Sequence, residues 1–353
     1  MSASPACCPP DYGYSPADLS RPPELEAETL YVVGGLYGNP EALAAILALR
    51  AREERAGRPV TLLFNGDFHW FDVDPRVFRE IGAAVLEHAA LRGNVEAELA
   101  RAGGGQDCGC SYPDYVEPGV PERSNAIFAR LAVTAAAFPE HRARLAALPL
   151  HRILAVAGRR IAVLHGDAES LAGWRLAEEA LRGLDAVADP AGAAGGEAAA
   201  CADGGGPAAP QTPLERIADW FRRAQVDAFA TTHTCLPFAR DFRVAGRTRL
   251  IVNNGSAGMP NFRGRCEGLL TRISARPEVP PDSLYGMAAS GVRYDALPVR
   301  YDAERWLRRF LADWPAGSPA HASYQRRIVD GPAYELEQAV RGGVQRTRLR
   351  RTA

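Results

Sequence analysis

Six apolar segments along the chain each end in glycine or a short polar residue, and this recurring pattern constrains the fold most strongly. Apolar runs bounded in this way are typical of buried strands, and several of the segments between them have helical spacing. In α/β proteins the loops that follow the strands converge on one crevice, where ligands bind. The sequence therefore predicts an α/β fold with its functional residues at these strand ends. The six ends are Gly34-Gly35, Asn65-Gly66-Asp67, Gly93-Asn94, His165-Gly166-Asp167, Thr232-His233 and Asn253-Asn254-Gly255-Ser256.

The first strand end lies in the segment LYVVGGLYGNPEALAAIL, residues 30–47. A buried strand is predicted over residues 30–33, and Asn39 is placed to cap a helix that has Pro40 at its first position. We expect this helix to run to about Ala56, before Gly57. The loop between strand and helix, GGLYGN, contains no Asp, Glu, His or Cys, so it offers none of the usual metal-binding side chains.

Charge and composition limit the classes of function. The 353 residues have a formal net charge of -1 and a pI of about 6.7, which provides no broad attraction for nucleic acid or anionic lipid. No apolar run approaches the roughly 18 residues of a membrane-spanning helix, and the N-terminal residues show no signal-peptide pattern. The chain contains no Lys, which excludes mechanisms that need a lysine amine. We expect a cytoplasmic protein with a small-molecule substrate and no nucleic-acid or membrane partner.

Shifts in composition divide the chain into three parts. Residues 1–28 are rich in Pro and small polar residues and are predicted to form an irregular N-terminal tail. Residues 29–315 are predicted to form the α/β domain, with insertions at about 103–122 and 185–211. The second insertion is rich in Ala and Gly and is predicted to be disordered. Residues 316–353 are predicted to form a C-terminal tail with some helical potential.

Four residues at successive strand ends form a candidate metal site, namely Asp67, Asn94, His165 and His233. Each of them alone is more often a helix cap or a hydrogen-bonded loop residue. Their joint occurrence in this order favours a shared site in the crevice. Carboxylate, amide and imidazole ligands suit hard or borderline divalent metals, so the sequence predicts one such metal there.

The order and spacing of these motifs resemble those of the calcineurin-like metallophosphoesterases, in particular their compact bacterial phosphodiesterase branch. The family pattern runs S-D-x-H-G-N, G-D, G-N-H-D/E, H-G, G-H-T-H and N-P-G-S. The matching segments here are GGLYGN, NGD, RGNVE, LHGD, TTHTC and NNGSAGMP, and the resemblance covers about residues 29–312. It implies a four-layer αββα sandwich with two metals bridged by one aspartate, which corresponds to Asp67. Asn94, His165 and His233 would complete the ligand shell of the second metal.

The other half of the ligand set implied by this resemblance is missing. The first Asp of the family falls on Gly35, its first His on Tyr37, and the last His of the fifth motif on Cys235. Glycine offers a metal only its backbone carbonyl, whereas a tyrosine phenolate suits Fe(III) and a cysteine thiolate suits zinc or iron. The His that follows the family's Asn is replaced by Val95, and the phosphodiesterase branch often carries a residue other than His at this position. We therefore interpret Cys235 as a further candidate metal ligand and Tyr37 as a candidate catalytic residue.

Three nearby features can compensate for the missing ligands. His69 and Asp72 follow the bridging aspartate closely enough for a loop to bend either side chain toward the vacant position. Cys108 and Cys110 lie in an insertion that can fold over the same crevice, and two further cysteines at positions 7 and 8 can do likewise from the tail. Of these residues, His69 is the second candidate catalytic residue.

The resulting hypothesis is a metal-dependent hydrolase of phosphate esters, above all phosphodiesters, with metal-activated water as the nucleophile. It requires one divalent transition metal, manganese, iron or zinc, and leaves a second metal open. Arg92 and Arg263 lie near the predicted loops and are candidates for phosphate contacts. Two alternatives stay open. One is a catalytically silent metal-binding or ligand-sensing protein on the same scaffold, and the other is an enzyme that uses redox-active iron on a different substrate.

Overall fold

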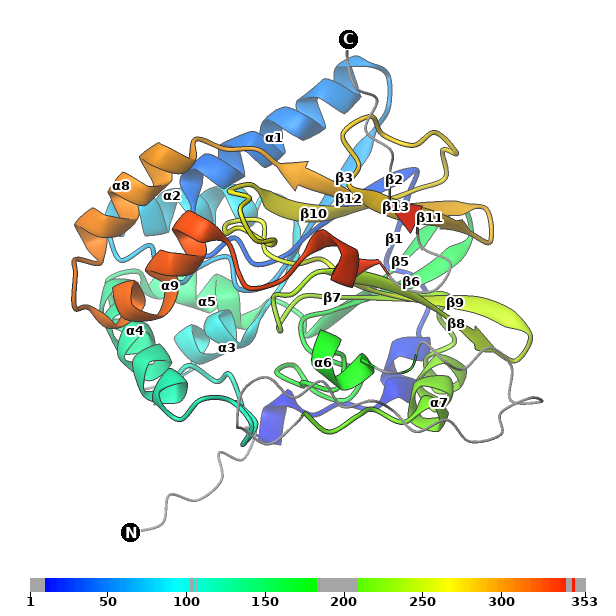
Figure 1. Cartoon of the computed structure of the whole chain (residues 1–353), viewed down its shortest axis with the longest axis horizontal. Coiled ribbons are helices and arrows are strands. Elements are labelled where there is room, and N and C mark those ends of the chain that lie inside the picture. The colour runs from blue at the N-terminus through cyan, green and yellow to red at the C-terminus, as the bar shows by residue number, and fades with distance from the viewer. Residues whose placement is uncertain are drawn as a thin grey trace.

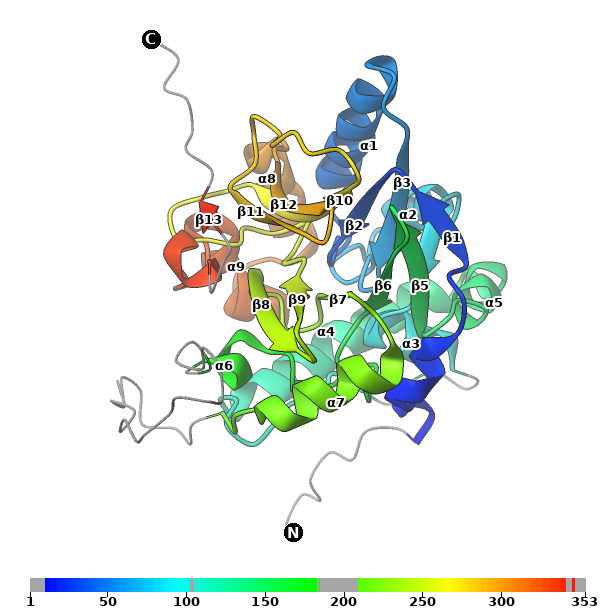
Figure 2. The same cartoon turned by 90° about the vertical axis from the view of Figure 1, so that its right-hand side faces the viewer.

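The computed structural model describes residues 10–101, 105, 107–182, 184, 209–340 and 345–346. Two β-sheets pack face to face, and helices cover the outer face of each sheet (Figures 1 and 2). The first sheet has the strand order β13-β11-β12-β10-β2-β3-β4, and the second has the order β1-β5-β6-β7-β9-β8. This arrangement is a four-layer αββα sandwich, so the predicted fold class is confirmed.

The bounds of the elements are as follows. The first sheet contains β2 (Thr29–Val33), β3 (Val60–Asn65), β4 (Ala89–Leu91), β10 (Gly268–Ser274), β11 (Tyr285–Ala289), β12 (Val292–Val299) and β13 (Gln345–Arg346). The second contains β1 (Leu25–Ala27), β5 (His151–Val156), β6 (Arg159–Leu164), β7 (Ala228–Thr231), β8 (Phe238–Val244) and β9 (Arg247–Asn253). The helices are α1 (Pro40–Arg55), α2 (Pro75–Val85), α3 (Asn94–Ala100), α4 (Gly119–Ala136), α5 (Pro139–Ala146), α6 (Glu178–Leu181), α7 (Leu214–Ala224), α8 (Ala303–Asp313) and α9 (Pro319–Asp330). Within the described residues, no helix is both long enough and apolar enough to cross a membrane.

Alternate residues of the central strands face different layers of the sandwich. In β2, Leu30 and Val32 belong to the core between the two sheets. Tyr31 and Val33 belong to the core beneath the outer helices, because successive side chains of a strand point to opposite faces. Both faces of the strand are covered, which explains why β2 reads as a continuous apolar run rather than an alternating one.

The helix that follows β2 begins as the sequence predicts. The Asn39 side chain accepts hydrogen bonds from the backbone N–H groups of Glu41 (3.0 Å) and Ala42 (3.1 Å). Pro40 occupies the first helical position and α1 ends at Arg55, which confirms the expected bounds. The cap fixes where the loop after β2 ends, and thus positions the residues that approach the crevice.

Parallel pairing brings the strand ends of each sheet to the same edge. β2, β3 and β4 are parallel neighbours in the first sheet, and β6, β7 and β9 are parallel neighbours in the second. A parallel bridge between Gly35 and Ser256 then connects the loop after β2 to the loop after β9. The loops after all six strands therefore meet at one end of the sandwich.

Regular structure extends beyond the predicted domain bounds of 29 and 315. β1 lies within the predicted N-terminal tail and pairs in parallel with β5. In the predicted C-terminal tail, α9 packs against α4. Three residues are too few to show a strand periodicity, and α9 buries only Ala320 and Ile328, so neither element has a strong sequence signal. Most of the predicted disordered insertion, residues 185–208, lies outside the described residues.

Candidate metal centre

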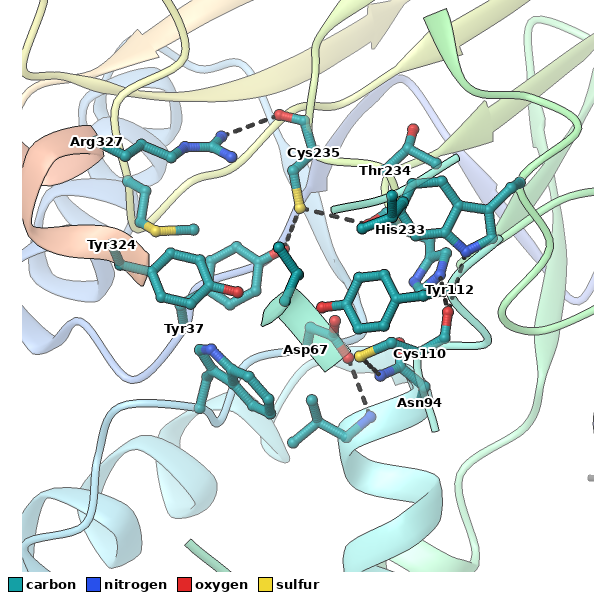
Figure 3. Close-up of a pocket in the computed structure, with 16 residues that line it drawn as sticks. Tyr37, Asp67, Asn94, Cys110, Tyr112, His233, Thr234, Cys235, Tyr324 and Arg327 are labelled. Carbon is teal, nitrogen blue, oxygen red and sulfur yellow. Dashed lines mark hydrogen bonds between the residues drawn. The ribbon is translucent and has the colours of Figure 1, made fainter. Parts of the chain in front are cut away.

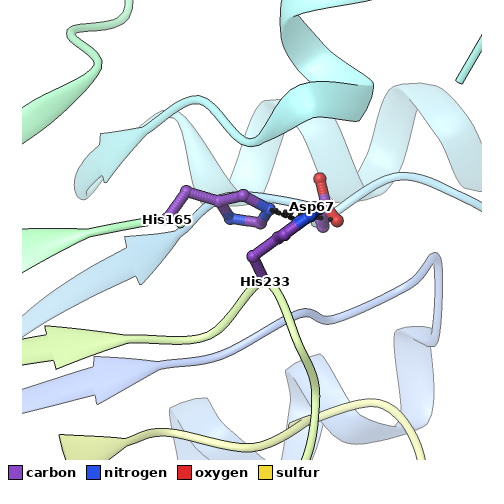
Figure 4. A group of neighbouring side chains, drawn as sticks. All are labelled: Asp67, His165 and His233. Carbon is purple, nitrogen blue, oxygen red and sulfur yellow. Dashed lines mark hydrogen bonds and ion pairs between the residues drawn. The ribbon is translucent and has the colours of Figure 1, made fainter. Parts of the chain in front are cut away.

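Three buried side chains from separate strand ends gather in the crevice (Figure 4). Asp67 follows β3, His165 follows β6 and His233 follows β7. One potential ligand atom from each lies within 4.8 Å of the others. In the part of the chain that the structure describes, this is the one group of three or more His, Cys, Asp or Glu side chains arranged in this way.

Three donor atoms surround His165 Nε2 at distances compatible with a shared metal ion. His165 Nε2 lies 3.3 Å from Asp67 Oδ2, 3.2 Å from His233 Nδ1 and 3.1 Å from Asn94 Oδ1. A metal bound at about 2.1 Å separates tetrahedral ligand atoms by about 3.4 Å. The four side chains predicted from the sequence thus come together with donor atoms that fit one divalent metal.

Backbone carbonyls hold three of these side chains in the orientation that a metal requires. His165 Nδ1 donates to the carbonyl of Asn65 (2.8 Å), and His233 Nε2 donates to the carbonyl of Cys110 (3.2 Å). Each bond assigns the ring proton to the outer nitrogen and directs the other nitrogen into the centre. Asn94 Nδ2 donates to the carbonyl of Cys108 (2.8 Å), which turns its oxygen inward.

The charges of the cluster are coupled through its burial. Burial alone would raise the pKa of Asp67, but the charge of His165 and its hydrogen bond to the carboxylate outweigh this effect and hold that pKa below its usual value. Burial lowers the pKa of His165, and the nearby Asp67 carboxylate more than reverses this effect. Burial and the charge of His165 lower the pKa of His233 to about 3, so this imidazole is neutral at neutral pH. A carboxylate and a neutral imidazole are the protonation states that bind metals.

The loop after β3 needs an unusual backbone to present Asp67. Asp67 has a φ of 52°, in the left-handed region that few non-glycine residues adopt. Its Oδ1 accepts a hydrogen bond from the backbone N–H of Val95 (3.2 Å), which leaves Oδ2 facing His165. A Cβ atom at Gly93 would lie 2.1 Å from Asp67 Oδ1, so only glycine allows this approach.

Glu96 supports the same loop from beneath, although sequence reasoning gave it no role. Its carboxylate is fully buried and accepts backbone N–H groups from Asp67 (2.7 Å) and Gly93 (2.9 Å) on Oε2. Oε1 accepts from Phe68 (3.0 Å) and His69 (3.2 Å). Burial and the charge of Asp67 raise the pKa of Glu96 to about 7. Its position after Gly93-Asn94 matches the acidic residue of the third motif, which was the available signal.

The other half of the crevice is filled by a tyrosine and a cysteine. A Cβ atom at Gly35 would lie 2.3 Å from Cζ of Tyr37, so the Tyr37 ring occupies the space that a side chain at position 35 would need. The Tyr37 hydroxyl lies 2.6 Å from Cys235 Sγ, within hydrogen-bonding distance. Burial raises the pKa of Tyr37 well above its usual value and also raises that of Cys235. Both groups are therefore protonated at neutral pH, and the structure does not bring Cys235 into the metal-binding group.

The predicted catalytic role of His69 does not match where its side chain lies. His69 Nδ1 lies 2.5 Å from Asp72 Oδ2, and its Nε2 lies 2.9 Å from Nε2 of His141. The ring is fully buried and stacks on Phe78 at a centroid distance of 4.1 Å. His69 and Asp72 thus bind each other in the core instead of compensating for the missing ligands.

The predicted arginines and the described cysteines do not contribute side chains to the metal-binding group. Arg263 forms a surface ion pair with Glu335 (2.7 Å), and Arg92 is half-buried, with an Nε that has no hydrogen-bond partner within the described structure. The insertion does fold over the crevice, but it holds Asn94 and His233 through the backbone carbonyls of Cys108 and Cys110 described above. The cysteines at positions 7 and 8 lie outside the described residues.

A cavity of about 260 Å³ opens beside the metal centre (Figure 3). Asp67, Asn94 and His233 line its floor together with the protonated pair of Tyr37 and Cys235. Its remaining walls are mainly aromatic and aliphatic, and Arg327 is the one arginine among the lining residues. The other lining residues are Trp70, Val95, Cys110, Tyr112, Val116, Val120, Trp174, Thr234, Met259 and Tyr324.

Several of these lining residues were not identified from the sequence. Arg327 and Tyr324 come from α9, which belongs to the predicted C-terminal tail, and Tyr112 comes from the insertion. Trp174 follows the loop after β6. The insertion and α9 carry no family motif, so the aromatic residues in the insertion were the sole signal available.

Comparisons with known proteins bear on the fold. No protein-family model matches the sequence, and no curated protein does. Among solved structures, a hypothetical protein from Pyrococcus horikoshii OT3 aligns with a TM-score of 0.53 and 15% identity, over 86% of this chain and 99% of that one. The two chains share a fold. At this identity, the similarity supports the αββα architecture alone.

Two further structures align with lower TM-scores. A metallophosphoesterase from Sphaerobacter thermophilus has a TM-score of 0.47 and 18% identity, over 87% of this chain and 100% of that one. Vps29 from Entamoeba histolytica, complexed with Zn²⁺, has a TM-score of 0.31 and 12% identity, over 77% of this chain and 99% of that one. The functional argument therefore rests on the geometry of the site.

Proposed function

We propose that the protein is a metal-dependent hydrolase of phosphate esters, of the phosphodiester type, that works with one metal. The observation that carries this proposal is the convergence of Asp67, Asn94, His165 and His233, whose donor atoms lie 3.1–3.3 Å from His165 Nε2. Oxygen and imidazole donors suit manganese, iron or zinc. When bound, such a metal supplies a Lewis acid that polarises a phosphoryl oxygen and activates water.

The chain's own residues have distinct tasks in this scheme. Asp67 supplies the single carboxylate of the set and keeps Oδ2 available, because Oδ1 is bonded to Val95 N–H. His165 and His233 present nitrogens whose tautomers are fixed by backbone carbonyls. The buried floor of the cavity limits access of bulk water, which strengthens the electrostatic interactions within it. Phosphoryl transfer depends mainly on positioning and charge neutralisation, which this arrangement provides.

A second function is favoured by the pair of Tyr37 and Cys235. These protonated side chains fill the half of the crevice in which the family resemblance implies another metal. A site with one metal lacks the clamp that stabilises both the attacking and the leaving oxygen in two-metal sites. The second candidate is therefore a catalytically silent protein that binds a metal and senses a phosphate ligand.

Hydrolysis of bis(p-nitrophenyl) phosphate by protein loaded in turn with Mn²⁺, Fe²⁺, Zn²⁺ and Mg²⁺ tests the first function against the second. We expect turnover with the transition metals and weaker turnover with Mg²⁺, which binds poorly to imidazole. His88→Ala is a matched control, because His88 is a half-buried histidine that stacks on Phe64 away from the centre. If the protein binds a metal but does not hydrolyse this substrate with any of the four metals, the result would contradict the hydrolase function and favour the sensing function.

A further inference from the structure

We propose that the cavity selects phosphate diesters with a small aromatic substituent, which packs against Tyr112 and Trp174 while Arg327 and Trp70 bind the phosphate oxygens. The proposal rests on the proposed function for the phosphate group, and it adds the class of substrate. Four observations support it: the aromatic wall, the unused donors opposite it, the charge of the lining residues and the size of the cavity.

The aromatic wall lies next to a metal ligand. The rings of Tyr112 and Trp174 have a centroid distance of 5.7 Å, and Trp174 meets the ring of His233 edge-on at 5.3 Å. Tyr112 and Trp174 are only half-buried, as are Val116 and Val120 beside them, so apolar surface faces the cavity. A flat aromatic group placed there would gain both area burial and ring contacts.

The opposite side of the cavity supplies donors for an anion. Arg327 donates through Nη2 to the carbonyl of Cys235 (3.1 Å) and through Nε to that of Pro260 (3.3 Å). A guanidinium has five N–H groups, so three are left for a ligand. Trp70 also lines the cavity, and its buried Nε1–H has no hydrogen-bond partner within the described structure. Arg327, Tyr112 and Asp67 line the same cavity (Figure 3), so a phosphate bound to Arg327 would share that cavity with the metal ligands.

The unpartnered indole is the strongest indication of a ligand. A buried donor without an acceptor is destabilising, and native structures leave few such groups. Trp70 is 3% exposed and belongs to the core beneath the outer helices, and it also lines the cavity. A phosphate oxygen that accepts from Trp70 Nε1 would remove this cost.

Charge and size narrow the class of ligand. Arg327 is the one arginine among the lining residues, and the chain contains no lysine. A phosphate diester carries one negative charge and needs less compensation than a monoester dianion. The cavity of about 260 Å³ is smaller than the roughly 300–1,000 Å³ typical of ligand pockets. It therefore suits a single aromatic ring with its phosphate better than a long nucleic-acid chain.

Titration calorimetry of the zinc-loaded protein with two non-hydrolysed ligands tests the proposal. Methyl phenylphosphonate and methyl methylphosphonate carry the same single charge and differ only in the aromatic group. We expect the phenyl ligand to bind about tenfold more tightly. Equal affinities, or no binding of either ligand, would overturn the proposal.

Variants then locate the two subsites. Trp174→Leu and Tyr112→Leu should each reduce the preference for the phenyl ligand to about twofold, while the affinity for the methyl ligand stays unchanged. Arg327→Gln should weaken both ligands by about the same factor, about tenfold. Tyr115→Leu is the matched control, because Tyr115 contacts Trp174 at 6.4 Å yet lines a different cavity. A preference that survives in both wall variants would overturn the aromatic subsite.

Metal content must accompany the Trp174→Leu measurement, because Trp174 Nε1 donates to the Cys110 carbonyl that also orients His233. Tyr112→Leu leaves that contact in place, so the two variants together separate loss of the wall from loss of the metal. Hydrolysis is measured separately with bis(p-nitrophenyl) phosphate. The phenyl preference without hydrolysis would contradict the hydrolase function alone, and hydrolysis without the preference would contradict the aromatic subsite alone.

Discussion

The two halves of the crevice are both built from loops that contain left-handed residues, but their chemistry is opposite. In one half, Asp67, His165 and His233 direct donor atoms at a common point, and backbone carbonyls fix their orientation. In the other half, Tyr37 and Cys235 bind each other, and burial keeps both protonated. One half can hold a cation. In the other half, the two polar side chains are protonated and contact each other.

The loops of the crevice do not need metal-binding side chains to adopt left-handed backbone conformations. Tyr37, Asp67 and Cys235 all have positive φ angles, at 52°, 52° and 60°. Such conformations persist only when the surrounding structure enforces them. Strand-end loops can therefore keep their shape whether their side chains bind a metal or only each other.

Removal of a metal ligand should have the largest effect. His165→Ala should lower the affinity for the metal by more than about a hundredfold, because a residue that binds the metal directly contributes more than the groups that only hydrogen-bond to such a residue, whose loss costs about 10–100-fold. Hydrolysis of bis(p-nitrophenyl) phosphate should fall to background. Metal affinity is measured by competition with a chelator. The control His88→Ala should keep wild-type affinity, and a His165→Ala protein that does so would contradict the assigned ligand set.

Disruption of the support beneath the metal-binding half should cost stability. In Glu96→Gln, one of the two oxygens that accept backbone N–H groups becomes an amide nitrogen. Two buried donors then lose their acceptor, so we expect the free energy of unfolding to fall by roughly 2–5 kcal/mol. Urea denaturation measures this change. The control Glu304→Gln alters a carboxylate that is 89% exposed, and it should change little.

An added methyl group at position 35 should destabilise the half of the crevice that contains Tyr37 and Cys235. Gly35→Ala places a Cβ atom 2.3 Å from the Tyr37 ring, so we expect a loss of about 1–3 kcal/mol from overpacking. In a Tyr37→Ala background the clash disappears, and most of the cost should disappear with it. Equal losses in the two backgrounds, measured by a double-mutant cycle, would show that Tyr37 does not fill the space at position 35.

Removal of the hydrogen bond between Tyr37 and Cys235 should have the smallest effect. Tyr37→Phe removes the contact with Cys235, and we expect about 1 kcal/mol of lost stability with no change in metal content. Cys235→Ala added to Tyr37→Phe should cost no further hydrogen-bond energy. A large loss of metal in Tyr37→Phe would instead identify the phenol as a ligand.

The sequence predicted the metal-binding half because its signal lies in strand ends. Asp67, His165 and His233 each follow a short apolar run, and parallel strands bring such residues to one edge. The α1 cap at Asn39 was predictable for a similar reason, since it depends on local backbone geometry. Local patterns determine these features, so a single sequence contains them.

The features that the sequence did not predict depend on tertiary packing. His69 lies two residues from Asp67, yet its side chain turns to Asp72 and away from the crevice. Arg327 reaches the cavity from α9, far along the chain and in a segment without a motif. β1 has only three residues, and it is defined by its pairing with β5. Neither the direction of a side chain nor a long-range contact follows from periodicity.

The metal content of the protein is the most direct test of the contrast between the halves. The protein is purified without chelator, saturated with zinc or manganese, freed of excess metal and analysed for its elements. We predict one metal per chain, in wild-type protein and in Cys235→Ala, because Cys235 is protonated and bonded to Tyr37. Two metals per chain would show that Tyr37 and Cys235 do form a second site, and no metal would contradict the assigned centre.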